Sequence, residues 1–448
     1  MKSKFLPIFI SISFLFFISC KKDDETNIYR ADTSTPDIAV KWTDMNLYIL
    51  KYSPSNTPTY ASRSLGYLGL TMYECVQVGS GRHLSMNGQL KGLPTLPQVE
   101  AGKKYNWILS LNAGQAFILK KLYPHTNNEN FKKIDSLAAV ILRGQSSEAA
   151  DVIDRSVKFG EAIAAAIFDW SETDGGENGY RRNFPVVLIP TNPGSWRPPV
   201  NGQVASQLPL HPFWGNNRTF IEKNGNMSVP QMIEYSTDPQ SPYYAQFLEV
   251  YNKNKILTQE EKEIATWWGD DPSETAAPPG HSINLATIAI KKAQSDLFKA
   301  AETYAKVGMA VGDAFINCWK CKYTYYAERP ASYVNAYIDV RWVQFWPEPP
   351  FPAFTSGHAT QSAAMATVLT ELYGDNFKFV DNTYEGRPMN TLRGISYKNR
   401  TFNSFWESAD ECAYSRLLGG IHTRQDNEVG TKEGKKIGAN VIALLWKK

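Results

Sequence analysis

Three short segments in the last third of the chain carry the residue types that hold a compact oxyanion. In chain order, the candidate residues are Lys322 and Arg329, then Ser356, Gly357 and His358, then Arg416, His422 and Asp426. A tetrahedral or trigonal oxyanion carries charge on all its outer oxygens, so the strongest sites surround it with guanidinium groups and an ammonium group. The three permanent cations in these segments therefore predict an anion site.

The small residues between these cations predict how the backbone approaches the anion. Gly357 has no side chain, so its N–H can come close to an oxygen, and the Ser356 hydroxyl adds a second donor. The following residues, 359–364, are predicted to begin a helix, and a helix N-terminus favours a bound anion.

His422 is the candidate for a direct bond to the central atom of the anion. It lies six positions after Arg416, with Gly419 and Gly420 between them, so one helix end can turn both side chains toward one pocket. Its imidazole can coordinate a metal or attack phosphorus. Asp426, four residues further on, can hold the other imidazole nitrogen and fix the tautomer.

The order Lys-x6-Arg-Pro, Ser-Gly-His and Ser-Arg-x5-His resembles the signature shared by the vanadium-dependent haloperoxidases and the type 2 phosphatidic acid phosphatases. Residues 349–359 resemble the haloperoxidase version closely, although Thr355 stands where that family usually has proline. Residues 193–199, 212–215 and 278–281 resemble segments of soluble bacterial haloperoxidases. The resemblance therefore extends over most of the chain.

The resemblance implies an all-α helical bundle built on four-helix packing, with long irregular connections and vanadate as cofactor. His422 matches the histidine that bonds vanadium in the peroxidases and that becomes a phosphohistidine in the phosphatases. His358 matches the acid/base group. The groups that match the donors to the equatorial oxygens are Lys322, Arg329, Arg416, Ser356 and the Gly357 N–H.

The peroxidase is favoured over an acid phosphatase that uses His422 as nucleophile. The lipid phosphatases are integral membrane proteins, whereas no segment after residue 20 has the roughly 18 apolar residues that a span needs. Trp319 and Phe351 match aromatic positions of halide pockets in chloroperoxidases and bacterial iodoperoxidases. The expected substrates are hydrogen peroxide and a halide, for which iodide is chosen, with an organic acceptor as a further candidate. A non-catalytic surface lipoprotein is the weaker alternative.

The N-terminus predicts export. Lys2 and Lys4 precede an apolar run, residues 5–18, and a lipobox-like ending places Cys20 directly after it. We expect a lipoprotein signal peptide over residues 1–19, lipidation of Cys20, and an outer-membrane lipoprotein on the cell surface or the periplasmic face.

Charge and cysteine content exclude some classes of partner and metal site. The formal net charge is +3, with no basic stripe, which excludes a typical nucleic-acid surface. Cys318 and Cys321 form no recognisable zinc motif and are predicted to be buried thiols beside the site.

The expected organisation is a lipid anchor and polar linker (20–35), an N-terminal helical half with an irregular Pro-rich connection (36–245) and a C-terminal catalytic half (246–448).

Helical periodicity is strongest in a few segments. The predicted helices are 38–51, 62–78, 107–122, 149–168, one from about 258, one over 282–320 with Lys322 just beyond it, one after His358, one around Arg416, and 430–446. Residues 174–245 are predicted to be irregular. His281 is interpreted as a structural histidine, and Asp270 and Asp271 are interpreted as partners of Arg416 or Arg329, or as a charge cluster at a helix end.

Overall fold

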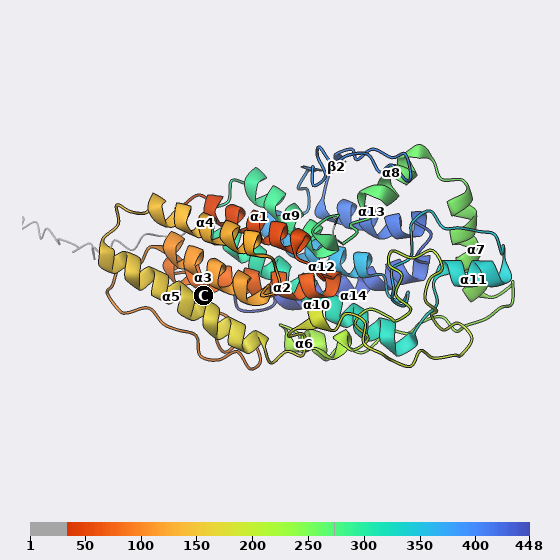
Figure 1. Cartoon of the computed structure of the whole chain (residues 1–448), viewed down its shortest axis with the longest axis horizontal. Helices are drawn as coiled ribbons and strands as arrows, with labels where there is room; N and C mark the ends of the chain where they lie inside the picture. Colours follow the sequence, from red (N-terminus) through yellow and green to blue (C-terminus); the bar gives the residue numbers. More distant parts are fainter. Residues whose placement is uncertain (1–33, 273) are drawn as a thin grey trace, which may run out of the picture.

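Helices make up nearly all the regular structure, in agreement with the all-α prediction. The computed structural model describes residues 34–272 and 274–448, and most of its long helices lie along one axis, whereas α7 crosses it (Figure 1). The predicted signal peptide, the lipidation site Cys20 and nearly all of the linker lie outside these residues. None of the helices in the described ranges is both long and apolar enough to cross a membrane.

The first part of the chain contains long helices and several helical segments of only three or four residues. Their bounds are α1 (Asp37–Tyr52), α2 (Pro58–Val76), η2 (Gln77–Ser80), α3 (Trp107–Leu122), α4 (Asn128–Gly144), α5 (Ala150–Ser171), η3 (Gly179–Arg181), η4 (Trp214–Asn216) and α6 (Glu222–Gly225).

The second part contains the longest helix and one small sheet. Its elements are α7 (Pro242–Lys255), α8 (Gln259–Trp267), α9 (Ala277–Lys292), α10 (Leu297–Tyr325), α11 (Pro330–Tyr337), α12 (Gly357–Tyr373), β1 (Phe379–Asp381), β2 (Arg400–Phe402), α13 (Phe405–Leu418) and α14 (Arg424–Ile442). The two strands are antiparallel, with Phe379 opposite Phe402.

The buried helix α10 organises the molecule. It packs against α2, α9, α12 and α14, and most of its side chains are buried. In Figure 1, α3, α4 and α5 lie toward one end, α7 and α11 toward the other, and α10, α12 and α14 lie between them. One hydrophobic cluster extends from Trp42 in α1 through α10 to Ile437 in α14.

Side-chain caps fix the helix starts on which the site depends. Ser356 accepts a hydrogen bond from the Ala359 N–H at 3.4 Å and so caps α12. Thr423 and Asp426 form a capping box at the start of α14, each side chain accepting from the other's backbone N–H. Such caps stabilise a helix by about 1 kcal/mol and set where the chain turns into it.

A glycine stripe on α14 brings its backbone against α12. A Cβ added at Gly434 would lie 2.1 Å from the Thr360 carbonyl oxygen, and one at Gly438 would lie 2.7 Å from that of Ala364. The Ser356 N–H also donates to the Asp426 carbonyl at 2.9 Å. The starts of α12 and α14, which carry the Ser-Gly-His segment and Asp426, are therefore held side by side.

Replacing Gly434 by alanine is expected to destabilise the fold by about 3 kcal/mol, because the added methyl meets backbone that cannot move aside cheaply. The check is the free energy of unfolding from chemical denaturation. Gly144→Ala at the end of α4 is the matched control, since a Cβ there meets nothing within 4 Å, and we expect no loss of stability. Equal stability of the two variants would contradict the close contact.

The structure corrects the helix predicted over residues 282–320. α9 ends at Lys292, Gln294 adopts a left-handed φ of 51°, and the Asp296 side chain caps the new helix α10 by accepting from the Lys299 N–H at 2.7 Å. Lys322 lies inside α10, not beyond it, because the helix continues to Tyr325. Tyr326, with a φ of 49°, ends it. The final helix likewise begins at Arg424, earlier than predicted.

The segment predicted to be irregular, 174–245, contains only η3, η4, α6 and the start of α7 as regular structure. It is fastened to α10 by Asp313, whose carboxylate accepts from the backbone N–H groups of Phe220 at 2.7 Å and Ile221 at 3.0 Å. Further along α10, the Leu210 carbonyl accepts from the Trp319 indole at 3.2 Å. The connection therefore forms one wall beside the candidate site.

Candidate active site

The structure brings the three sequence segments together at one end of α10. Lys322 lies in the last turns of α10, Arg329 precedes α11, Ser356 and Gly357 begin α12, Arg416 lies in the last turn of α13, and His422 precedes α14. A cavity of about 680 Å³ opens onto four of the candidates: Gly357, His358, Arg416 and His422. All eight predicted residues of the anion site therefore belong to one region. The other four are buried and do not line the cavity: Lys322, Arg329, Ser356 and Asp426.

His422 is buried and held in one tautomer. Its Nδ1 lies 3.0 Å from the Asp426 carboxylate, which also accepts from the Thr423 N–H at 3.1 Å. Burial and the nearby cations Arg329, Lys322 and Arg416 hold the pKa of His422 well below its usual range. The imidazole is therefore neutral, Nδ1 donates to Asp426, and Nε2 carries the lone pair.

Arg329 contacts His422 at its other ring nitrogen, Nε2. Its guanidinium donates to the Ile421 carbonyl at 2.8 Å and to the Phe351 carbonyl at 2.9 Å, and its Nη1 lies 3.3 Å from His422 Nε2. Burial lowers the pKa of Arg329 to about 10, so the group stays charged at neutral pH. A fixed cation thus lies beside the nitrogen that would bond the central atom.

Lys322 is fully buried, and its ammonium holds the loop that leads into α12. It donates to the carbonyl oxygens of Pro352 at 2.9 Å, Ala353 at 2.8 Å and Thr355 at 2.6 Å. Burial lowers its pKa to about 8. Its three hydrogens are directed at this loop, so in this structure Lys322 contributes its charge to the site and fixes the backbone that carries Ser356 and Gly357.

The start of α12 supplies hydrogen-bond donors from a small side chain and from the backbone. Ser356 Oγ accepts only a weak capping bond, which leaves its own hydrogen available. A Cβ placed on Gly357 would point toward the cavity, with nothing nearer than the Trp319 ring at 3.8 Å. The backbone at Gly357 is therefore open to a ligand that a larger side chain would exclude.

Two buried polar atoms of the site have no partner among the described residues. They are Nε of Arg416 and Nε2 of His358. Arg416 also donates from Nη1 to the Trp268 carbonyl, and burial lowers its pKa. A buried guanidinium nitrogen without an acceptor is costly, so an oxyanion in the cavity would satisfy it.

His358 is uncharged in the free protein. Burial, followed by Arg416 and His281, holds its pKa well below the usual range, and the Trp268 carbonyl opposes this only in part. A neutral imidazole at the edge of the cavity can accept a proton and later return it.

The two aromatic candidates form one wall of the cavity. The Trp319 and Phe351 rings lie 4.9 Å apart, and both line the cavity that His358 and Arg416 line. Cys318 and Cys321 are buried free thiols, as predicted, and Cys318 contacts the Thr355 carbonyl at 3.3 Å.

The predicted pairing of Asp270 or Asp271 with an arginine of the site is wrong, whereas the alternative, charges at a helix end, and a structural His281 agree with the structure. Among the described residues, neither aspartate forms an ion pair with Arg416 or Arg329. Asp270 instead pairs with His281, and Asp271 accepts from the Gln203 amide at 2.8 Å and the Trp346 indole at 3.3 Å. The network of Asp270, His281 and Asp381 was not foreseen, because Asp381 lies 100 positions from its partner.

Comparisons with known proteins give the relatives of this chain. The family model described as the VCPO second helical-bundle domain matches residues 339–447. The vanadium chloroperoxidase of Curvularia inaequalis is 26% identical in an alignment 362 residues long, which covers 62% of this chain and 58% of that protein. The chain thus matches little more than half the length of this curated relative.

Solved structures match over nearly the whole chain. A bacterial vanadium-dependent iodoperoxidase is 30% identical, with a TM-score of 0.80, and the match covers 93% of this chain and 98% of that one. A bacterial vanadium-dependent chloroperoxidase in its holo form is 15% identical, with a TM-score of 0.67 and coverage of 91% and 97%, which supports the fold alone. The helical fold and the assembled site define a haloperoxidase-type protein. The chain belongs to the vanadium-dependent haloperoxidase family.

Proposed function

We propose that this protein is a vanadium-dependent haloperoxidase that oxidises iodide with hydrogen peroxide to hypoiodous acid. The single observation that carries the proposal is the neutral, tautomer-fixed His422, whose Nε2 lies among three buried cations. The residues fit vanadate, because Arg416 Nε and His358 Nε2 are without partners and the backbone at Gly357 is open. When bound, vanadate supplies a Lewis acid that activates hydrogen peroxide toward attack by a halide.

The residues of the chain would divide the work as follows. His422 Nε2 would hold the metal, and Asp426 keeps Nδ1 protonated so that the Nε2 lone pair stays available. Arg329, Arg416, Lys322, Ser356 and the Gly357 N–H offset the negative charge of the anion and withdraw electron density from its oxygens.

His358 would handle the proton. In the net reaction, iodide loses two electrons, the O–O bond of hydrogen peroxide breaks, and one further proton is taken up from solvent. One oxygen ends in hypoiodous acid and the other leaves as water. The neutral His358 can accept a proton from the incoming hydrogen peroxide and return it to the departing oxygen, so one group serves both steps.

Iodide is the proposed halide. It is the easiest halide to oxidise, the wall formed by Trp319 and Phe351 is apolar, and the iodoperoxidase is 30% identical to this chain. The test is a comparison of iodide, bromide and chloride at equal concentration after loading with vanadate. Oxidation of iodide well above the other two supports the proposal, whereas faster oxidation of chloride would contradict the choice of halide.

Asp426→Asn is expected to lower vanadate-dependent activity by about 10- to 100-fold, the usual effect of losing the partner that orients a metal ligand. One carboxylate oxygen, Oδ2, accepts from both His422 Nδ1 and the Thr423 N–H. The asparagine carbonyl oxygen can keep both contacts, but without the negative charge that strengthens the bond to the imidazole. The measurement is the activity against added vanadate. The exposed Glu428→Gln on the same helix is the control and should retain full activity. A shift in activity no larger than that of the control would contradict the role of Asp426.

Export and lipid anchoring at Cys20 are further proposals, supported only by residues 1–25 of the sequence. They would place the enzyme on a bacterial outer membrane, where hydrogen peroxide and halide reach it from outside. Labelling of the expressed protein with a radioactive fatty acid, lost in Cys20→Ala, is the expected result. Equal labelling of both proteins would contradict lipidation of Cys20.

A further inference from the structure

A second histidine with two carboxylates lies buried behind His358. The His281 imidazole lies between Asp270, whose two carboxylate oxygens are 3.0 and 3.1 Å from Nδ1, and Asp381, whose Oδ2 is 2.9 Å from Nε2. The side chains of His281 and both aspartates are almost completely buried, at 1% or less exposure. No role in the reaction proposed above uses this cluster.

Three separate parts of the fold build the cluster. His281 lies in the first turns of α9, Asp270 in the turn after α8, and Asp381 at the end of β1. The indole of Trp268 stacks on the His281 ring at 4.5 Å, with an interplanar angle of 18°. A position reached from three elements and stacked in this way is tightly fixed.

His281 is a cation in this setting. Burial opposes its charge, but Asp270 and Asp381 outweigh burial and raise its pKa to about 10. Both carboxylates have further donors, because Tyr384 donates to Asp270 and the Trp267 indole donates to Asp381 at 2.8 Å. The three charges sum to one negative charge, and the hydrogen-bonding groups of the cluster are satisfied.

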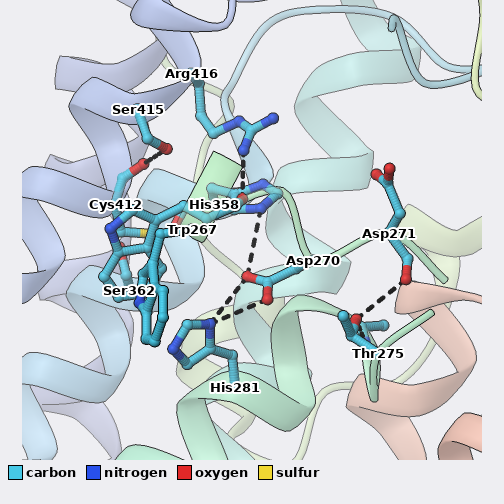
Figure 2. A network of polar contacts seen from close by, with 12 residues as sticks. Trp267, Asp270, Asp271, Thr275, His281, His358, Ser362, Cys412, Ser415 and Arg416 are labelled. Atoms are coloured by element: carbon cyan, nitrogen blue, oxygen red, sulfur yellow. Dashed lines mark hydrogen bonds and ion pairs between the residues drawn. The ribbon is translucent and has the colours of Figure 1, made fainter. Parts of the chain in front are cut away.

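The cluster reaches the catalytic region through Asp270. Its Oδ2 lies 3.9 Å from Nε2 of His358, the nitrogen that has no hydrogen bond in the described structure. Figure 2 shows Asp270 between the two imidazoles, with contacts drawn to both, and Arg416 on the opposite side of His358. Asp270 itself has a left-handed φ of 51°, so its backbone is held in an uncommon conformation for this contact.

We propose that His281 is a positioning residue for the peroxidase reaction: clamped as a cation between Asp270 and Asp381, it fixes the Asp270 carboxylate beside Nε2 of His358. The Trp268 carbonyl accepts from His358, whose Nε2 has no hydrogen bond, so the proton lies on Nδ1 and Nε2 is the basic nitrogen. The carboxylate stabilises the imidazolium that forms when Nε2 takes up a proton. This inference rests on the proposed acid/base role of His358. It assigns to His281 a part in the reaction beyond the structural role that the sequence suggested.

The charges around His358 give the direction of each substitution. The groups that face it are Arg416 and Cys412 from α13, Lys322 from α10, His281 from α9, Asp270 from the turn after α8, and His422 from the turn before α14. His281→Gln removes a cation and leaves two carboxylates, so the pKa of His358 should rise. Asp270→Asn removes a carboxylate, so the pKa of His358 should fall further. Asparagine tolerates the left-handed backbone, which makes this a mild change.

The test uses the full protein with ¹⁵N-labelled histidines, whose imidazole nitrogens report protonation and tautomer directly by NMR. We expect both His281 nitrogens to stay protonated up to a pH of about 9, consistent with its pKa of about 10. We expect His358 to be neutral with one dominant tautomer. In His281→Gln, His358 should take up its proton at a pH that is higher by about 1. The pH–rate profile of iodide oxidation should move in the same direction, and Asp270→Asn should move it the opposite way.

His83→Gln is the matched control, because His83 packs against Phe298 at the far end of α10 and should leave the His358 signals unchanged. Binding of inorganic phosphate, measured by calorimetry, checks that the anion site is intact in each variant. A neutral His281, or unchanged His358 signals and pH profile in folded His281→Gln, would overturn the inference. If the protein oxidises no halide, the proposed function fails, yet the NMR signals of His281 and His358 still decide whether the clamp exists.

Discussion

His422→Ala is expected to abolish vanadate-dependent halide oxidation, with a loss of at least about 100-fold, because even a residue that only orients a metal ligand typically accounts for 10- to 100-fold. The imidazole contributes the one bond from the protein to the central atom in the proposed site. Its removal leaves the Asp426 carboxylate without its main partner and leaves the cations without a covalent anchor for the anion. The measurement is iodide oxidation across a titration of added orthovanadate.

The control for this substitution is His83→Gln, which changes a partly buried histidine far from the cavity and should retain full activity. Circular dichroism and the unfolding midpoint establish that His422→Ala is folded. Iodide oxidation by folded His422→Ala at the wild-type rate and the wild-type vanadate concentration would show that another residue binds the metal.

Arg416→Lys is expected to weaken binding of vanadate and of phosphate by about 10- to 100-fold, since a hydrogen bond to a charged group contributes about 1.5–3 kcal/mol. Lysine keeps the charge but not the planar group, which bonds the Trp268 carbonyl from Nη1 and has a buried Nε without a partner among the described residues. Calorimetry with inorganic phosphate on the metal-free protein measures this directly, and activation by vanadate measures it again in the assembled enzyme.

Arg424→Lys is the matched control for Arg416→Lys. Arg424 lies on the surface and pairs with Glu249 there, so the substitution should change anion affinity by less than about twofold. Unchanged phosphate affinity in Arg416→Lys would mean that this guanidinium does not face the anion, and the arrangement of the cradle proposed here would have to be revised.

The sequence alone was sufficient to predict contacts between residues that lie close together in the chain. His422 and Asp426 are four positions apart, and a capping box at the start of α14 turns both toward one another as predicted. Ser356 and Gly357 begin a helix for the reason given by their types: a hydroxyl cap followed by a residue without a side chain. Helix starts and contacts within one turn depend on neighbouring residues, so they could be predicted from the sequence.

Features that depend on distant partners could not be predicted in this way. Nothing near His281 indicates that Asp381 will reach it from a strand 100 positions away, or that Asp270 will turn toward it and not toward Arg416. The hydrogen bonds from Lys322 to three loop carbonyls were not predicted for the same reason, because these carbonyls lie about 30 positions away. The break before α10 did have a local signal in Asp296, a helix-capping residue in the middle of the predicted helix.

The most direct measurement is iodide oxidation by hydrogen peroxide with protein stripped of phosphate, before and after addition of orthovanadate, with hydrolysis of a phosphate ester followed on the same sample. A vanadium-dependent haloperoxidase should be inactive when stripped, should gain iodide oxidation with vanadate, and should lose it again in His422→Ala. Hydrolysis of the ester that vanadate inhibits, without any oxidation of halide, would contradict the proposed function and indicate a phosphatase that uses His422 as its nucleophile.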